Sequence, residues 1–183
     1  MRDRLRIFEV DHPATQEWKR RCLIEAGIPV PASLTFVPVD FERERLPEKL
    51  TDAGFDSGRR AFFLWLGVVP YLTVDAVFST LAFIAGLPGG ADVAFDYSNP
   101  PESLTLDDRV RHEARAASVS GAGERWLSYF DSDELHRRLR ALGFSSIDDI
   151  GPREIRSRYL PGAPPAPSDT GGHVVLASTH GVI

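Results

Sequence analysis

The stretch from Phe62 to Thr73 constrains the fold of this chain more than any other part of the sequence. A nearly unbroken run of apolar residues is interrupted there only by Gly67 and Pro70. Such a run predicts a strand buried on both faces of a parallel sheet, with the glycine and the proline ending it. Thr73 then begins a helix, because its side chain can cap the first turn. Ligands of open α/β sheets bind just outside the carboxyl ends of such strands, so we expect residues 64–71 to border any site.

The rest of the chain alternates between short β-rich segments and segments whose apolar residues have helical spacing. This alternation predicts one α/β domain over residues 1–183, with a mainly parallel sheet covered by helices on both faces and an antiparallel edge formed by the last strands. We expect strands at 5–10, 34–39, 61–66, 92–97, 144–150 and 173–177, and helices at 15–26, 47–53, 74–85, 102–118, 131–142 and 152–159.

The composition argues against several kinds of partner. The net charge of −5 disfavours binding to nucleic acid or to an anionic membrane surface. The single cysteine excludes an internal disulfide bond, and the scattered histidines lack the spacing of a metal site. No apolar run reaches membrane-spanning length, and the opening residues do not form the core of a signal peptide. We therefore expect a soluble, cytoplasmic protein.

Two consecutive predicted strands end in an aspartate. Asp11 follows the first strand, and Asp40, with Phe41 beside it, follows the second. In nucleotide-binding α/β folds an acidic residue at such a strand end accepts hydrogen bonds from ribose hydroxyls. A carboxylate beside an aromatic ring can likewise bind an adenine amino group while the ring stacks on the base. A turn or a helix cap explains either aspartate equally well on its own. Two consecutive strands that both end in aspartate are stronger evidence for a nucleotide site than either one alone.

The residues do not identify a catalytic group. A Gly-x-Ser-x-Gly elbow is absent, so an α/β-hydrolase would lack its nucleophile. The glycine-rich segment from Gly86 to Gly90 precedes a strand and does not open a helix, so it is not a phosphate loop. Ser128 and Tyr129 are candidates for a position near a site, whereas Asp131 is expected to cap a helix with Glu134.

Taken together, these stretches resemble the leucine carboxyl methyltransferase-like family of S-adenosylmethionine-dependent methyltransferases, in particular its bacterial polyketide O-methyltransferase-like branch. The resemblance runs along essentially the whole chain. The residues that carry it are Phe8–Gln16, Val39–Phe41, Phe63–Thr73, Phe95–Tyr97, Trp126–Phe130 and Leu142–Phe144. It implies a Rossmann-like class I methyltransferase sheet with S-adenosylmethionine as the cofactor.

The resemblance also assigns cofactor contacts to particular residues. It implies that Asp11, with His12 beside it, binds the ribose, and that Asp40 and Phe41 surround the adenine. The loop bordering the methionine end and the methyl-transfer pocket would then contain Leu64, Trp65, Leu66 and Tyr71. The position of Leu66 is often a glutamate in this family, so this chain lacks a charged contact there.

The largest departure from the family lies at the front of the chain. Family members begin with a strand and a glycine-rich loop that cradles the methionine part of the cofactor, and this sequence starts just after that motif. The resemblance therefore implies a truncated domain. In the family's sheet the absent strand lies between the strands expected at 5–10 and 61–66. Those strands would pair directly, take a strand from elsewhere, or leave buried backbone groups unpaired at roughly 1–3 kcal/mol each.

Several functions are consistent with these observations. The first is an O-methyltransferase acting on a carboxylate or hydroxyl of a small molecule, since methyl transfer needs in-line positioning more than an acid or base. The second is a non-catalytic remnant or binding module, with a homodimer formed through an exposed sheet edge. A truncated gene model is the third, and an in-frame glycine-rich motif upstream would reveal it. A dinucleotide-dependent oxidoreductase would also use Asp11, but the stretch from Trp65 to Thr73 fits it poorly.

Overall fold

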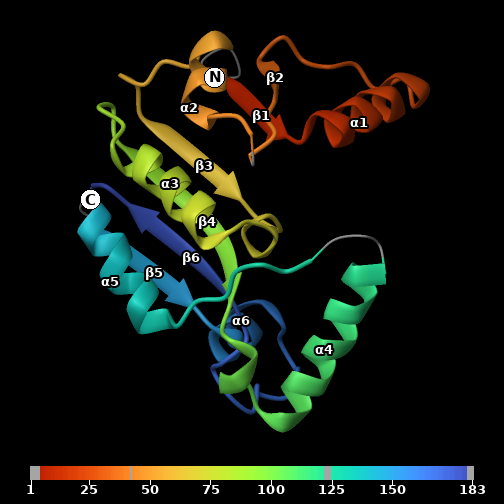
Figure 1. Ribbon diagram of the computed structural model, residues 1–183, viewed down its shortest axis with the longest axis vertical. Helices are drawn as coiled ribbons and strands as arrows, with labels where there is room; N and C mark the ends of the chain where they lie inside the picture. Colours follow the sequence, from red (N-terminus) through yellow and green to blue (C-terminus); the bar gives the residue numbers. More distant parts are fainter. Residues whose placement is uncertain (1–4, 42, 122–124, 181–183) are drawn as a thin grey trace. The chain divides into compact units, whose positions relative to one another are not determined.

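A computed structural model describes residues 5–41, 43–121 and 125–180 of the chain (Figure 1). The chain divides into two compact units, unit 1 from Met1 to Asp56 and unit 2 from Ser57 to Ile183. Each unit has its own sheet, of two strands in unit 1 and four in unit 2. A single domain over residues 1–183 stays a prediction.

Unit 1 is built from two strand–helix pairs. Its elements are β1 (Ile7–Asp11), α1 (Pro13–Glu25), β2 (Leu34–Pro38) and α2 (Leu46–Asp52). β1 and β2 run parallel, with Asp11 opposite Pro38, so both carboxyl ends lie at the same edge of the sheet. The buried Gln16 of α1 donates from Nε2 to the carbonyl oxygen of Glu9 at 3.0 Å and thereby fixes the helix to β1.

Unit 2 contains a mixed sheet of four strands in the order β3-β4-β6-β5. β3 and β4 are parallel, whereas β6 is antiparallel to both β4 and β5. The elements of unit 2 are β3 (Ala61–Trp65), η2 (Val69–Tyr71), α3 (Val74–Ala85), β4 (Ala91–Ser98), η3 (Pro101–Ser103), α4 (Leu106–Gly121), α5 (Ser132–Leu142), β5 (Ser146–Ile150), α6 (Pro152–Tyr159) and β6 (Gly172–Ser178).

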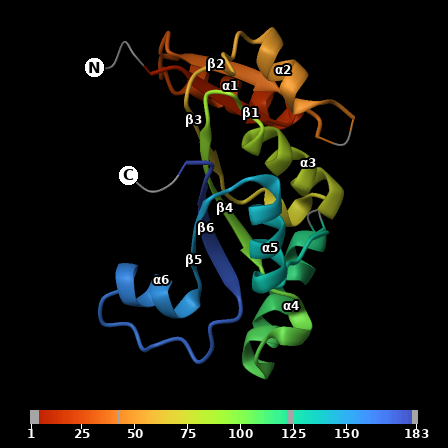
Figure 2. The same cartoon turned by 90° about the vertical axis from the view of Figure 1, so that its left-hand side faces the viewer.

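The predicted α/β fold is confirmed, and so is an antiparallel edge formed by the last two strands, because β5 lies at the edge and pairs antiparallel with β6. The expectation of a mainly parallel sheet is wrong for unit 2, whose four-stranded sheet is mixed: β3 and β4 pair in parallel, whereas both pairs made by β6 are antiparallel. The cause is the segment from 160 to 171, which returns the chain so that β6 enters between β4 and β5 in the opposite direction. Helices do lie on both faces of this sheet, α3 and α5 on one and α6 on the other (Figure 2).

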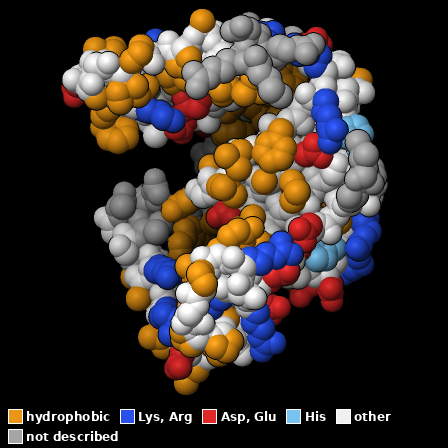
Figure 3. Space-filling view, turned by 180° about the vertical axis from the view of Figure 1, so that it is seen from behind, with side chains coloured by type: hydrophobic (Ala, Val, Ile, Leu, Met, Phe, Trp, Pro, Cys, Tyr) orange, Lys and Arg blue, Asp and Glu red, His pale blue; other side chains and the backbone are white. Residues whose placement is uncertain are grey.

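The prediction that the stretch beginning at Phe62 is buried on both faces is also wrong. Phe63 of β3 contacts Phe83 of α3 with ring centroids 6.4 Å apart, and Trp65 is buried on the same face. Phe62 and Leu64, which alternate with them, are 63% and 70% exposed. Figure 3 views the molecule from the side opposite to α3 and α5 and shows hydrophobic side chains gathered at that surface. Phe62 and Leu64 on β3 are therefore left uncovered among the described residues, although α6 lies on the same face of the sheet.

Direct pairing of β1 with β3 is not seen in the described residues. β1 pairs with β2 alone and β3 with β4 alone, so β1 and β3 each have one edge without a strand partner in that part of the chain.

Among the described residues, no helix combines the length and the apolar character needed to cross a membrane.

Candidate functional site

The carboxyl end of the sheet in unit 1 brings the two predicted aspartates into neighbouring loops. The backbone N–H of Val39 donates to the carbonyl oxygen of Asp11 at 2.9 Å, directly after the paired strands end. Asp40 and Phe41 follow Val39, and both are half-buried. Parallel pairing therefore places Asp11 beside the loop of Asp40, as the strand pattern predicts.

The side chain of Asp11 keeps a free acceptor. Its Oδ1 accepts from the backbone N–H of His12 at 2.7 Å, while Oδ2 has no hydrogen-bond partner among the described residues. His12 is the residue that caps α1, because its Nδ1 accepts from the N–H of Ala14 at 3.3 Å. The capping role thus falls to His12, and the half-buried Asp11 carboxylate still offers one oxygen to a ligand.

Asp40 is held by its own turn. Its backbone N–H donates to Oε2 of Glu44 at 3.0 Å, and its carboxylate lies 3.7 Å from Nε of the exposed Arg43. An exposed ion pair of this length contributes little to stability, and its exposed arginine can move aside. The turn therefore fixes the backbone of Asp40, whose carbonyl oxygen also accepts from the N–H groups of Arg43 and Glu44.

The predicted contacts in unit 2 do not all lie in one environment. Leu64 and Leu66 are exposed, Tyr71 is half-buried in η2, and Trp65 lies in the core with its ring centroid 6.3 Å from that of Phe95. Side chains alternate along a strand, so Trp65 faces the covered side of the sheet while its neighbours Leu64 and Leu66 face the other side. The four residues thus lie close together along the chain, but their side chains do not all point to the same side of the sheet.

The loop after β3 is fixed by contacts with β4 and with the segment at 126–130. Gly67 adopts a positive φ of 72°, and its N–H donates to Oδ1 of Asp96 at 2.6 Å. Ser128 donates from Oγ to the carbonyl oxygen of Val69 at 2.8 Å, and Leu127 donates its N–H to that of Pro70 at 2.6 Å. These bonds fix the turn η2 at the carboxyl end of the parallel pair β3–β4, where ligands of α/β sheets bind.

A cavity of about 240 Å³ opens at the carboxyl end of β4. Its walls come from the end of β4, from α4, from Trp126, from the beginning of α6 and from the segment before β6. The polar and aromatic side chains that line it include Asn99, Asp108, Arg111, His112, Arg115, Trp126 and Arg156. Sequence reasoning did not identify the arginines. The spacing of Arg111 and Arg115, four residues apart on α4, is the signal that places them on one helix face.

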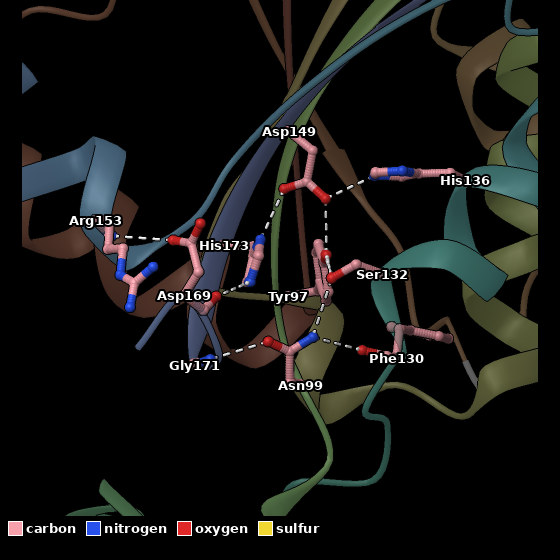
Figure 4. A network of polar contacts seen from close by, with 10 residues as sticks. All are labelled: Tyr97, Asn99, Phe130, Ser132, His136, Asp149, Arg153, Asp169, Gly171 and His173. Carbon is pink, nitrogen blue, oxygen red and sulfur yellow. Dashed lines mark hydrogen bonds and ion pairs between the residues drawn. The ribbon is translucent and has the colours of Figure 1, made fainter. Parts of the chain in front are cut away.

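Behind this cavity, Asp149 is the centre of a network of polar contacts (Figure 4). Its carboxylate, 5% exposed, accepts from Oη of Tyr97 at 2.8 Å and lies 2.7 Å from Nε2 of His136 and 2.9 Å from Nδ1 of His173. Burial by itself would raise the pKa of Asp149, but the hydrogen bonds from His173, Tyr97 and His136 outweigh it and hold that pKa below its usual value. Burial likewise raises the pKa of Tyr97 well above its usual range.

The network also fixes a wall of the cavity. The buried Asn99 donates from Nδ2 to the carbonyl oxygen of Phe130 and to Oγ of Ser132, both at 3.1 Å. Its Oδ1 accepts from the N–H of Gly171 at 2.9 Å, and both Asn99 and Gly171 line the cavity. Because Ser132 also lies 2.7 Å from Oη of Tyr97, the Asp149 network and this wall form one connected set of bonds.

The stability of unit 2 should depend on acid through Asp149. Its folded pKa lies below the value of about 3.9 expected in an unfolded chain, so the folded protein binds fewer protons there. The stabilisation is therefore present above the unfolded value and is lost progressively as the pH falls from there through the lower pKa of the folded protein. We expect the difference in unfolding free energy between wild type and Asp149→Asn to narrow from pH 6 to pH 3. A difference that stays constant over this range would contradict the assignment.

The chain matches one family model and several curated proteins. Residues 1–85 match the model described as leucine carboxyl methyltransferase. The protein named "Putative S-adenosyl-L-methionine-dependent methyltransferase YktD" of Bacillus subtilis is 32% identical over 159 residues, which cover 85% of this chain and 51% of that protein. A similarly named protein of Mycobacterium tuberculosis, Rv1896c, is 38% identical over 112 residues, covering 61% and 34% respectively. The chain thus spans about half the length of YktD and about a third of the length of Rv1896c.

Several solved structures with a similar fold are named as methyltransferases. A putative O-methyltransferase from Nostoc punctiforme superposes with a TM-score of 0.55 at 13% identity, covering 94% of this chain and 44% of that one. A possible histamine N-methyltransferase from Thermotoga maritima gives 0.52 at 12% identity, covering 95% and 73%. At these identities the likeness shows the fold alone. The sequence matches confirm the predicted resemblance to the leucine carboxyl methyltransferase family, whose model matches residues 1–85 of this chain.

Proposed function

We propose that this chain acts as an S-adenosylmethionine-dependent O-methyltransferase on a carboxylate or hydroxyl of a small molecule. The observation that carries the proposal is the free Oδ2 of Asp11 at the carboxyl end of β1, beside the loop of Asp40. A half-buried carboxylate oxygen without a partner fits the paired hydroxyls of a ribose, each of which donates a hydrogen bond. The relatives named as methyltransferases and the class I fold support the same cofactor.

The residues of unit 1 would hold the adenosine part of the cofactor. Asp11 would accept from the ribose hydroxyls, and Asp40 with Phe41 would bind the adenine through a carboxylate and an aromatic ring. Contacts of the loop from Leu64 to Tyr71 with the methionine part stay a prediction. Bound S-adenosylmethionine supplies an electrophilic methyl group: the acceptor oxygen forms the O–CH₃ bond as the C–S bond breaks, and the electron pair remains on sulfur.

The acceptor oxygen decides what this chain must provide. A carboxylate acceptor carries no proton, so the residues around it need only bind and orient it. A hydroxyl acceptor has to lose a proton as the new bond forms and therefore needs a base nearby. Positioning alone can supply a large part of the rate acceleration in such a transfer.

Asp11→Ala should weaken cofactor binding to the full chain. We expect S-adenosylmethionine and S-adenosylhomocysteine to bind in the micromolar range, about −8 kcal/mol. Removing a charged acceptor of ribose hydrogen bonds costs about 1.5–3 kcal/mol, a loss of roughly ten- to a hundredfold in affinity. Isothermal titration calorimetry of wild type and variant measures the change.

Asp52→Ala is the matched control, because Asp52 is an exposed aspartate at the end of α2 in the same unit. It should leave cofactor affinity unchanged. Equal binding by Asp11→Ala and wild type would remove Asp11 from the site. A folded wild-type chain that binds neither compound would contradict the proposal and favour the non-catalytic binding module.

A further inference from the structure

The cavity at the carboxyl end of β4 is positively charged in an otherwise acidic protein. Three arginines and one carboxylate, that of Asp108, are among the residues that line it, whereas the whole chain has a net charge of −5. A concave site of one charge with apolar walls concentrates ligands of the opposite charge. The charge distribution therefore favours an anion in this cavity.

Two of the three arginines, Arg115 and Arg156, form no ion pair within 4 Å with a described carboxylate, although the charge of Arg156 helps to lower the pKa of Asp108. Arg111 pairs with Asp108 at 2.6 Å, and Asp108 also accepts from Oγ1 of Thr105 at 2.6 Å. Arg156 donates from Nη1 to a neutral acceptor, the carbonyl oxygen of Pro164, at 3.0 Å. Arg115 has no ion pair or hydrogen bond with any described residue. The guanidinium groups of Arg115 and Arg156 are thus free to bind a carboxylate, for which their planar geometry is suited.

His112 gives a second and independent indication of a ligand. Both of its ring nitrogens are buried and lack a hydrogen-bond partner among the described residues. The ring lies against Trp126 and Tyr129, with centroids 5.0 and 5.4 Å away, and it lines the cavity. Burial lowers the pKa of His112, so the ring is neutral at pH 7 and offers one donor and one acceptor. Buried polar atoms are rarely left unpaired, which points to a polar group supplied by a ligand.

Part of the remaining wall is apolar, beside the polar Ser98, Ser168 and Thr170. Leu104, Pro152, Ala166 and Trp126 contribute to this apolar part, and Leu104 and Ala166 are themselves buried. A volume of about 240 Å³ lies below the range of about 300–1,000 Å³ that is typical of drug-sized ligands. These walls suit a small ligand with an apolar body and not a bare inorganic anion. The bonds of Asn99 hold the cavity in shape before a ligand arrives, which reduces the cost of ordering it.

We infer that this cavity binds a small organic acid, with its carboxylate between Arg115 and Arg156 and its apolar body against Trp126. His112 supplies a further hydrogen bond to the acid. Only the identification of the acid as the methyl acceptor rests on the proposed function. The binding of the acid itself rests on unit 2 alone.

Three probes of matched shape or charge test this inference on the full chain. Benzoate has the carboxylate and the apolar body, benzamide keeps the shape without the charge, and inorganic phosphate keeps the charge without the body. We expect benzoate to bind at least about tenfold more tightly than either and to shift the NMR signals of the His112 ring. Equal affinity for benzoate and benzamide, or for benzoate and phosphate, would overturn the inference.

Arginine variants locate the binding. Arg115→Gln and Arg156→Gln should each weaken benzoate binding by about tenfold, because each removes a charged donor and keeps a side chain of similar length. Arg137→Gln is the control, since Arg137 is exposed on α5 and does not line the cavity. Circular dichroism and thermal melts check that each variant is folded. Unchanged benzoate affinity in both cavity variants would refute the site.

The same variants separate this inference from the proposed function. Arg115→Gln should leave the affinity for S-adenosylmethionine unchanged while it weakens benzoate. A wild-type chain that binds benzoate but not the cofactor would support the acid site and contradict the methyltransferase proposal. A chain that binds the cofactor but not benzoate would support the methyltransferase proposal and contradict the acid site.

Discussion

Asp149→Ala should lower the free energy of unfolding of unit 2 by about 3–5 kcal/mol, the cost of removing one partner from a buried charged network. The carboxylate accepts from Tyr97 and contacts both His136 and His173, and it is 5% exposed. Without it, all three groups lose an acceptor, and the buried His173 has no water to replace it, whereas Tyr97 keeps its contact with Ser132 and His136 is 23% exposed. The substitution also leaves space where the carboxylate was, which adds to the loss.

Urea unfolding in a Trp18→Phe background measures this change. Trp18 belongs to unit 1 and is 60% exposed, so its removal leaves Trp65 and Trp126 to report on unit 2 alone. Asp148→Ala is a matched control from the neighbouring position. The side chain of Asp148 is 61% exposed and lies 4.0 Å from Nη1 of Arg158, so its loss should cost less than about 0.5 kcal/mol.

Similar losses in the two variants would show that the network contributes no more than a surface ion pair. The fluorescence transition also has to follow the far-ultraviolet dichroism of the variant, because a two-state analysis requires coincident probes. A large change in the slope of the unfolding free energy against urea concentration would indicate an altered native or denatured state. In that case the midpoint of the transition alone would not measure the change in stability.

The role of Asp149 could not be predicted from the sequence because two adjacent aspartates look alike there. Strand alternation requires that they face opposite sides of the sheet, but it does not say which one is inside. The register decides: Asp149 lies opposite the buried Val175, and Asp148 lies opposite the exposed Leu176. That register depends on β6, whose place between β4 and β5 no local pattern specifies.

The aspartates of unit 1 could be predicted because their arrangement follows from neighbouring parts of the chain. Each strand–helix pair has a local sequence pattern, and parallel pairing of consecutive strands brings Asp11 beside the loop of Asp40. The cavity arginines are an intermediate case. Helical spacing alone relates Arg111 to Arg115, whereas Arg156 reaches the same cavity from α6 through tertiary packing.

The apolar stretch at β3 shows where a correct local pattern gave a wrong environment. An unbroken apolar run does predict a strand, and β3 is present at Ala61–Trp65. Burial on both faces requires a covering element that is encoded elsewhere, and the described residues leave Phe62 and Leu64 exposed. Hydrophobicity thus predicted the element, while its surroundings depend on the rest of the fold.

Gly89→Ala should destabilise unit 2 by about 3 kcal/mol, at the upper end of the cost of overpacking. A Cβ at Gly89 would lie 2.4 Å from the backbone carbon and oxygen of Arg59, far inside normal contact. Backbone atoms cannot rotate away as a flexible side chain can. The N–H of Gly89 also donates to the carbonyl oxygen of Ser57 at 2.9 Å, so the two segments cannot separate without losing this bond.

Gly172→Ala is the matched control for this prediction, since no atom lies within 4 Å of its Cβ position and its φ is not positive. The same urea assay should show a change of less than about 0.5 kcal/mol for it. If Gly89→Ala unfolds at the same urea concentration as this control, close packing of the turn before β4 is not what requires a glycine there. If only Gly89→Ala is destabilised, Gly89 serves the close approach of two backbone segments, which explains why a glycine stands there before a strand.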